Sequence, residues 1–221
     1  MLAELESKYP WLPYVAPMAI FMIITSMESS AGADYPLLYI AKVVVVAVAL
    51  MMFKTPLREI KFEAKWIVPS VVIGLVLLGL WVGIEQALVY PHLGERTGYN
   101  PFEKIKDPAM RSSFIAFRFV GLALLVPVME EIFWRSFGLR FASQPDFRSL
   151  PIGTFTWTGF GLVAAVFAGS HPEWIPAAIF AAATALWIRH TKSLFACIVV
   201  HGVTNLGLGI YVVTQNAWKF W

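Results

Sequence analysis

The chain of 221 residues is strongly apolar, with 58% hydrophobic, 15% aromatic and only 14% charged side chains. Soluble domains carry about a quarter charged residues, so this composition indicates an integral membrane protein and excludes a disordered chain. A formal net charge of +3 is too small to indicate nucleic-acid binding. The single cysteine, Cys197, permits neither an internal disulfide nor a cysteine-based zinc site.

Seven apolar segments are candidates for membrane-spanning helices, each of which needs about 20 residues. We therefore expect one integral membrane domain over residues 1–221, with the all-α fold of a polytopic transmembrane helix bundle of about seven spans, or eight. The polar interval 91–111 is predicted to be a partly helical loop. The predicted spans cover residues 11–27, 35–53, 66–90, 113–141, 155–171, 174–188 and 194–213.

The distribution of Lys and Arg predicts the orientation of the chain. With a cytoplasmic N-terminus, nine of these residues lie inside and six outside, which agrees with the positive-inside rule. We therefore expect the N-terminus in the cytoplasm and the C-terminus outside. The inside set is Lys8, Lys54, Arg58, Lys61, Lys65, Arg140, Arg148, Arg189 and Lys192, and the outside set is Arg96, Lys104, Lys106, Arg111, Arg118 and Lys219.

Ionisable residues within spans are costly and mark functional sites by default. Arg135 lies four residues after Glu131, on the same face of a helix, so the two can neutralise each other. Glu130 lies about 100° away on that helix and has no local partner. A buried carboxylate without a counter-charge suits a general base. Pro127 removes a backbone hydrogen bond just before the acid pair and is expected to kink or open the helix.

Two further clusters each contain a histidine. His171 lies at a predicted helix break, where Ser170 and Glu173 have the spacing of a capping box. His201 and Asn205 are spaced i, i+4, so an imidazole and a carboxamide share one helix face. A rise of about 1.5 Å per residue places Glu130 and His171 at similar depths but puts His201 nearer a membrane surface.

Each cluster also has a purely structural interpretation. Glu131 and Arg135 would then be a buried pair that satisfies only its own members, and a lone membrane histidine would be a hydrogen-bonded packing residue. Lys42, Glu85 and Arg118 lie near span ends or on single faces of spans, where they are expected to snorkel or to contact other helices.

Three motifs occur in a fixed order: Glu-Glu-x-x-x-Arg at 130–135, Phe-x-x-x-His at 167–171 and His-x-x-x-Asn at 201–205. Together they resemble the CAAX protease and bacteriocin-processing (CPBP, or Abi) family of intramembrane proteases. The resemblance covers residues 113–213, the expected catalytic core. The compact size and the N-terminal spans resemble the exosortase-associated CAAX prenyl protease-related subgroup of bacteria.

The resemblance implies an intramembrane glutamate protease that hydrolyses a peptide bond of a membrane-associated protein or peptide. Glu130, assisted by His171, would activate water. His201 and Asn205 would hydrogen-bond the oxyanion, a role that their N–H groups suit. The resemblance also implies a bacterial inner membrane and an association with an exosortase system, with no cofactor, no metal and no nucleic acid. The implied supporting residues are Glu131, Arg135 and Phe167.

Three alternatives stay open. Two His, two Glu and an Asn could bind Zn²⁺. A non-catalytic binding or immunity protein, or a proton-coupled transporter, would also use buried charges, although the sequence shows no internal repeat of the kind many transporters have. Other intramembrane proteases are disfavoured because the sequence contains neither H-E-x-x-H nor G-x-S-G.

Overall fold

The computed structural model describes residues 2–96 and 98–221, and every regular element within those ranges is helical. Short 3-10 turns cover Gly32–Asp34, Ala64–Trp66, Phe147–Ser149 and Trp218–Phe220, and π-helical segments cover Gly121–Leu125 and Ile132–Gly138. The α-helices are α1 (Leu2–Lys8), α2 (Leu12–Glu28), α3 (Tyr35–Met52), α4 (Lys54–Leu57), α5 (Ile67–Ala87), α6 (Pro101–Lys104), α7 (Pro108–Val120), α8 (Val126–Glu131), α9 (Leu139–Phe141), α10 (Trp157–Gly169), α11 (Trp174–Thr191) and α12 (Leu194–Gln215).

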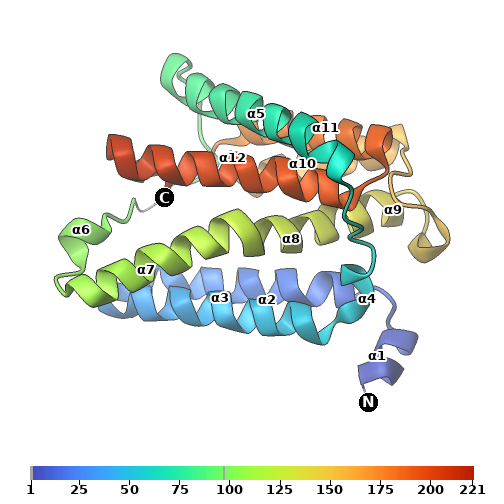
Figure 1. The fold of residues 1–221 in the computed structure, drawn as a ribbon, viewed down its shortest axis with the longest axis horizontal. Coiled ribbons are helices and arrows are strands. Elements are labelled where there is room, and N and C mark those ends of the chain that lie inside the picture. The colour runs from blue at the N-terminus through green and yellow to red at the C-terminus, as the bar shows by residue number, and fades with distance from the viewer. Residues whose placement is uncertain (1, 97) are drawn as a thin grey trace.

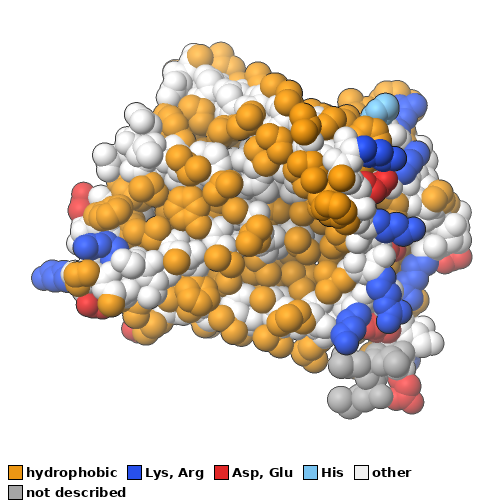
Figure 2. Space-filling view, in the orientation of Figure 1, with side chains coloured by type: hydrophobic (Ala, Val, Ile, Leu, Met, Phe, Trp, Pro, Cys, Tyr) orange, Lys and Arg blue, Asp and Glu red, His pale blue; other side chains and the backbone are white. Residues whose placement is uncertain are grey.

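The expected all-helical membrane architecture is confirmed. Four helical stretches of the described chain are long and apolar enough to cross a bilayer: Gly32–Met52, Ala64–Ala87, Pro108–Phe141 and Leu194–Gln215. Two shorter apolar helices cover Leu12–Glu28 and Trp157–Gly169. Figure 2 shows hydrophobic side chains across the middle of one face and Lys and Arg gathered towards its ends, which is the distribution that a bilayer favours.

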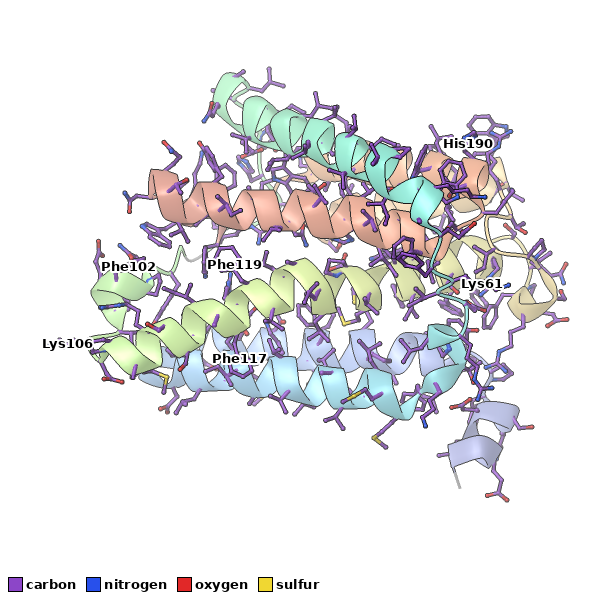
Figure 3. All side chains as sticks on the ribbon, in the orientation of Figure 1. Lys61, Phe102, Lys106, Phe117, Phe119 and His190 are labelled. Carbon is purple, nitrogen blue, oxygen red and sulfur yellow. The ribbon has the colours of Figure 1, made fainter. Side chains whose placement is uncertain are left out.

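The helices form two sides with α8 running between them (Figure 1). Helices α2, α3 and α7 lie on one side, and α5, α11 and α12 on the other. Figure 3 shows how α7 contributes to both: Phe119 lies on the side of α12, and Phe117 lies on the side of α3. The α7–α8 region therefore joins the two sides of the bundle.

Helices α5 and α12 approach each other closely because small residues line their contact. A Cβ atom on Gly74 would lie 2.8 Å from the carbonyl oxygen of Val200. The Thr204 hydroxyl donates a hydrogen bond of 3.0 Å to the Gly74 carbonyl oxygen. Small residues and interhelical hydrogen bonds are how helices associate in lipid, where the hydrophobic effect gives no driving force between them.

The longest helical stretch runs from Pro108 to Phe141 and is interrupted by the two π-helical segments. It begins five residues before the predicted span because Asp107 caps it, its carboxylate accepting from the Met110 amide at 2.8 Å. Pro108 occupies the first turn, where its missing N–H costs nothing. The polar interval 91–111 thus contains α6 and the start of α7.

The predicted helix break near His171 is present, but the end of the fifth apolar segment differs from the expectation. Helix α10 ends at Gly169, so His171 lies in the connection and not in a span. The capping-box prediction was wrong: the Ser170 hydroxyl donates to the Phe167 carbonyl at 2.7 Å, and Glu173 precedes α11 without capping it. Glu173 is instead engaged by Arg96, a partner that local spacing could not reveal.

Candidate active site

One cavity of about 350 Å³ brings the three clusters together. Residues from α2, α3, α5, α7, α8, α11 and α12 line it, together with residues of the connection between α10 and α11. All four residues predicted as catalytic are in its wall: Glu130, His171, His201 and Asn205. The depth mismatch expected for His201 does not separate it from the others. Phe167 also lines the cavity, whereas Glu131 and Arg135 lie behind it in the protein interior.

Glu130 is buried in the cavity wall with 8% of its surface exposed. Its Oε2 atom has no hydrogen-bond partner among the described residues. Buried polar atoms are almost always satisfied, so an unpartnered carboxylate oxygen needs a specific explanation. A water molecule or a substrate group in the cavity would satisfy it.

The imidazole of His171 is oriented by its own backbone turn. Its Nδ1 atom lies 2.8 Å from the Phe167 carbonyl oxygen, which can only accept, so Nδ1 carries the proton and donates. In the neutral ring the lone pair is then on Nε2. The ring also stacks on Phe167 with 4.5 Å between centroids and meets the edge of Trp81 at 6.0 Å. His171 is therefore held in one tautomer, with Nε2 as its acceptor.

An extended segment, 88–96, lies over the connection that carries His171, and we call it the strap. The Leu93 amide donates to the Pro172 carbonyl at 3.0 Å, and the Trp174 indole donates to the Pro91 carbonyl at 2.9 Å. Arg96 donates twice to the Glu173 carboxylate, at 2.8 and 3.0 Å. Desolvation opposes ionisation of Glu173, but the Arg96 guanidinium prevails and lowers the pKa of that carboxyl.

Glu131 is fully buried and contacts two basic side chains at once. Its Oε2 atom lies 3.1 Å from Arg135 Nε, as the i, i+4 spacing predicted. Its Oε1 atom lies 2.8 Å from His201 Nδ1, a contact between residues 70 positions apart. Arg135 also donates to the Thr184 hydroxyl and lies over the Phe167 ring at 5.0 Å. Glu131 therefore links the first motif to the third.

Asn205 is anchored by a backbone carbonyl that Pro127 leaves free. In the π-helical segment before Pro127, the Val126 amide donates to the carbonyl five residues earlier, that of Gly121. The next carbonyl, that of Leu122, lacks the corresponding donor because proline has no N–H. Asn205 Nδ2 donates to this oxygen at 2.9 Å. One N–H of the carboxamide is thus used for positioning, and the other is available to the cavity.

Sequence reasoning missed the contacts that join distant segments. The Glu131–His201 hydrogen bond and the Arg135–Thr184 hydrogen bond carry no local signal. The anchor of Asn205 could have been anticipated in part, because a proline within a span always frees a carbonyl. Within residues 2–96 and 98–221, no group of three or more His, Cys, Asp and Glu side chains is arranged to hold a metal ion.

The comparison with known families agrees with the geometry. Residues 112–207 match the family model of the Rce1-like type II CAAX prenyl endopeptidases. Neither the curated proteins nor the solved structures give a match. The matched segment contains all three motifs and both π-helical segments. Residues 112–207 of this integral membrane protein are therefore similar to the CAAX proteases, which is the resemblance that its motifs indicated.

Proposed function

We propose that the protein is an intramembrane glutamate endopeptidase in which Glu130 and His171 activate a water molecule. The observation that carries the proposal is the unpartnered, buried Oε2 atom of Glu130 in a cavity that it shares with His171, His201 and Asn205. A buried base beside a fixed imidazole acceptor is what water activation requires. The match to a peptidase family supports the same chemistry.

The reaction would proceed in two steps. Glu130 takes a proton from water while the water oxygen bonds to the peptide carbonyl carbon, whose π electrons move onto oxygen. The oxyanion is held by N–H donors of Asn205 and His201. When the C–N bond breaks, Glu130 returns its proton to the departing amine. His171, with its Nε2 lone pair free, orients the attacking water.

The contact with Glu131 determines which form of the His201 ring could donate a hydrogen bond to the oxyanion. The Nδ1 proton of His201 is donated to the Glu131 carboxylate, so Nε2 can donate only if the ring is an imidazolium. We propose that His201 acts in this charged form, stabilised by Glu131. The two carboxylates Glu130 and Glu131 then balance Arg135 and His201, so the buried cluster has no net charge.

The wider biological setting is also part of the proposal. The substrate is a membrane-associated protein or peptide, and the protein is placed in a bacterial inner membrane with a cytoplasmic N-terminus. The seven apolar helical segments would be its spans, with α11 as the sixth. The proposed association with an exosortase system rests on size and N-terminal resemblance alone.

The test compares protein termini in membranes from cells that lack the protein and are complemented with wild type or Glu130→Gln. Glutamine has the shape of glutamate but cannot accept the proton, so new termini should appear only with wild type. The matched control is Glu103→Gln, which makes the same change on the exposed surface of α6 and should behave as wild type. Equal cleavage by Glu130→Gln would overturn the assignment of the base.

The same membranes discriminate the alternative functions. Activity that is lost with a chelator and restored by Zn²⁺ would replace the proposal with a metallopeptidase. Identical termini in all strains, with the phenotype restored by both forms, would indicate a binding or immunity protein. Proton-coupled uptake that depends on Glu130, without new termini, would indicate a transporter.

A further inference from the structure

A second cavity, of about 470 Å³, lies at one end of the bundle, away from the candidate active site. Three basic residues line it: Arg58 and Lys61 from the connection between α4 and α5, and Lys192, which follows α11. We call this cavity the basic pocket. Figure 3 places Lys61 where the chain passes from α4 to α5, and Figure 2 shows Lys and Arg side chains gathered at that end of the bundle.

The acidic side chains of the pocket wall are already paired with groups outside it. A Glu59 carboxylate oxygen lies 2.9 Å from Arg140, and the Tyr14 hydroxyl donates to the same carboxylate at 2.9 Å. Glu63 Oε1 lies 3.4 Å from Lys65 Nζ. Because Arg140 and Lys65 do not line the pocket, the three basic residues that do line it leave an excess of positive charge.

Those three basic residues have no acidic partner in the described chain. Neither Arg58 nor Lys61 forms a side-chain hydrogen bond or an ion pair with residues 2–96 or 98–221. Lys192 is held by a neutral group, because its Nζ atom donates to the Gly153 carbonyl at 2.7 Å. A Cβ atom on Gly153 would lie 2.6 Å from the Lys192 Cδ atom, so glycine lets the loop close on this side chain. Lys192 is therefore fixed in position while its charge stays available to an anion.

The basic pocket lies at the depth of the lipid headgroups. Two of the helical stretches that are long enough to cross a bilayer, Ala64–Ala87 and Leu194–Gln215, begin directly after its lining residues Glu63 and Ser193. The headgroup region of a bilayer surrounds the ends of such spans. Arginine binds a phosphate through paired N–H groups and lysine binds it as a point charge, so the lining suits a phosphate at this depth.

An exposed apolar surface begins beside the pocket and continues along α5. Phe62, which lies between two lining residues, is 73% exposed, and the centroid of its ring lies 5.1 Å from that of Phe195. Four residues of α5 that are more than half exposed have the i, i+4, i+7, i+8 spacing of one helix face: Val68, Val72, Leu75 and Val76. An acyl chain can lie along this face, whereas a soluble phosphate compound would make no use of it.

We propose that the basic pocket binds the phosphate group of an anionic phospholipid whose acyl chains lie along α5. The inference does not depend on peptidase activity. Its ligand chemistry is that of a phosphate ester, and the exposed apolar face of α5 favours a lipid as the source. The pocket belongs to the end predicted to face the cytoplasm, where anionic lipids give a membrane leaflet its negative surface potential.

Thermal unfolding of the purified full-length protein in neutral detergent tests the proposal. The protein is titrated with phosphatidylglycerol, with phosphatidylcholine and with glycerophosphoglycerol, which is the anionic headgroup without acyl chains. A ligand that binds only the folded state raises the Tm with a dependence on concentration that gives its Kd. Only phosphatidylglycerol should do so. Lys61→Gln and Arg58→Gln should each weaken its binding about fivefold, the upper end for an exposed ion pair.

The matched control is Lys54→Gln, which removes an exposed charge from α4 at the same end of the bundle but outside the pocket lining. This variant should bind phosphatidylglycerol as wild type does. An equal loss in Lys54→Gln, or binding that survives both pocket substitutions, would indicate attraction to general surface charge and overturn the proposal. Equal effects of phosphatidylglycerol and phosphatidylcholine would also overturn it.

The headgroup compound separates the two possible sources of the phosphate. If glycerophosphoglycerol raises the Tm as much as the lipid does, and Lys61→Gln removes the effect, the pocket belongs to a soluble phosphate ester and the lipid assignment is wrong. Arg58 and Lys61 are both exposed, and the two single substitutions are independent, so the test is decisive even if one variant fails to fold.

Discussion

At the scale of single residues, the site depends on side chains that do two things at once. Glu131 lies beside both Arg135 and His201, so the residue expected to support the helix also positions a proposed oxyanion donor. The Glu131–Arg135 pair could be predicted because both partners lie on one helix. The contact with His201 could not, because it joins positions that only packing brings together.

Asn205 allows a sharp test at this scale. Asn205→Ala should lower the turnover number by about 10² to 10³, the usual cost of losing one oxyanion donor. The Michaelis constant should change little, because the oxyanion exists only in the transition state. Steady-state cleavage of a substrate peptide measures both constants.

A matched change on the same helix is Gln215→Ala, at the exposed end of α12. This variant should keep wild-type kinetics. If Asn205→Ala alters only the Michaelis constant, Asn205 binds substrate and does not stabilise the oxyanion.

At the scale of elements, hydropathy located the helices well and their irregularities poorly. All seven predicted segments overlap helices of the structure. The π-helical segments around Pro127 were anticipated only as a kink or opening, since apolar periodicity does not report a change of hydrogen-bond register. The end of the fifth segment was misplaced for a similar reason: residues 170 and 171 are next to an apolar run but belong to a turn.

The strap gives an element-scale prediction about pH. The pKa of Glu173 is lowered in the folded protein. The Arg96–Glu173 pair therefore contributes its full stabilisation of the fold at any pH above the pKa that Glu173 has in the unfolded chain. This contribution is lost as the pH falls through the lowered pKa of the folded state. Arg96→Gln should therefore lower the Tm at neutral pH, by about 2–4 °C for a pair worth about 1 kcal/mol. The difference from wild type should disappear in acid, below the ordinary range of glutamate.

Thermal unfolding of both proteins across pH measures this difference. Lys104→Gln is a suitable control, because Lys104 is an exposed residue of α6 that forms no ion pair with the described residues. The effect of this substitution on the Tm should not depend on pH. A difference between Arg96→Gln and wild type that grows as pH falls would contradict the role of Glu173 as the ionised partner.

At the scale of the whole molecule, the arrangement of charge indicates two membrane faces. Lys61 and Lys106 lie at opposite ends of the bundle (Figure 3). The predicted inside set includes Lys61, and the predicted outside set includes Lys106. The sequence therefore assigned these two lysines to opposite ends of the bundle correctly, because the charges that flank each span can be read locally. Which of the two ends faces the cytoplasm is still a prediction.

The single cysteine makes the orientation easy to measure. Cys197 is 0% exposed, so the wild-type protein should not react with a membrane-impermeant maleimide. Positions 61 and 106 are both exposed and lie on opposite faces. In intact cells, Lys106→Cys should therefore be labelled at once and Lys61→Cys only after lysis. Spheroplasts replace intact cells if an outer membrane is present. The reverse pattern would show that the N-terminus lies outside.

The division of the site between the two sides of the bundle also bears on how the protein is made. Glu130 is on the stretch that joins the sides, whereas His201 and Asn205 are on α12, the last long helix of the described chain. Translation therefore delivers the proposed base before the proposed oxyanion donors. Until α12 inserts, Glu131 lacks its imidazole and the Leu122 carbonyl lacks its amide. In the proposed mechanism the site is therefore complete only after α12 has been inserted beside the earlier helices.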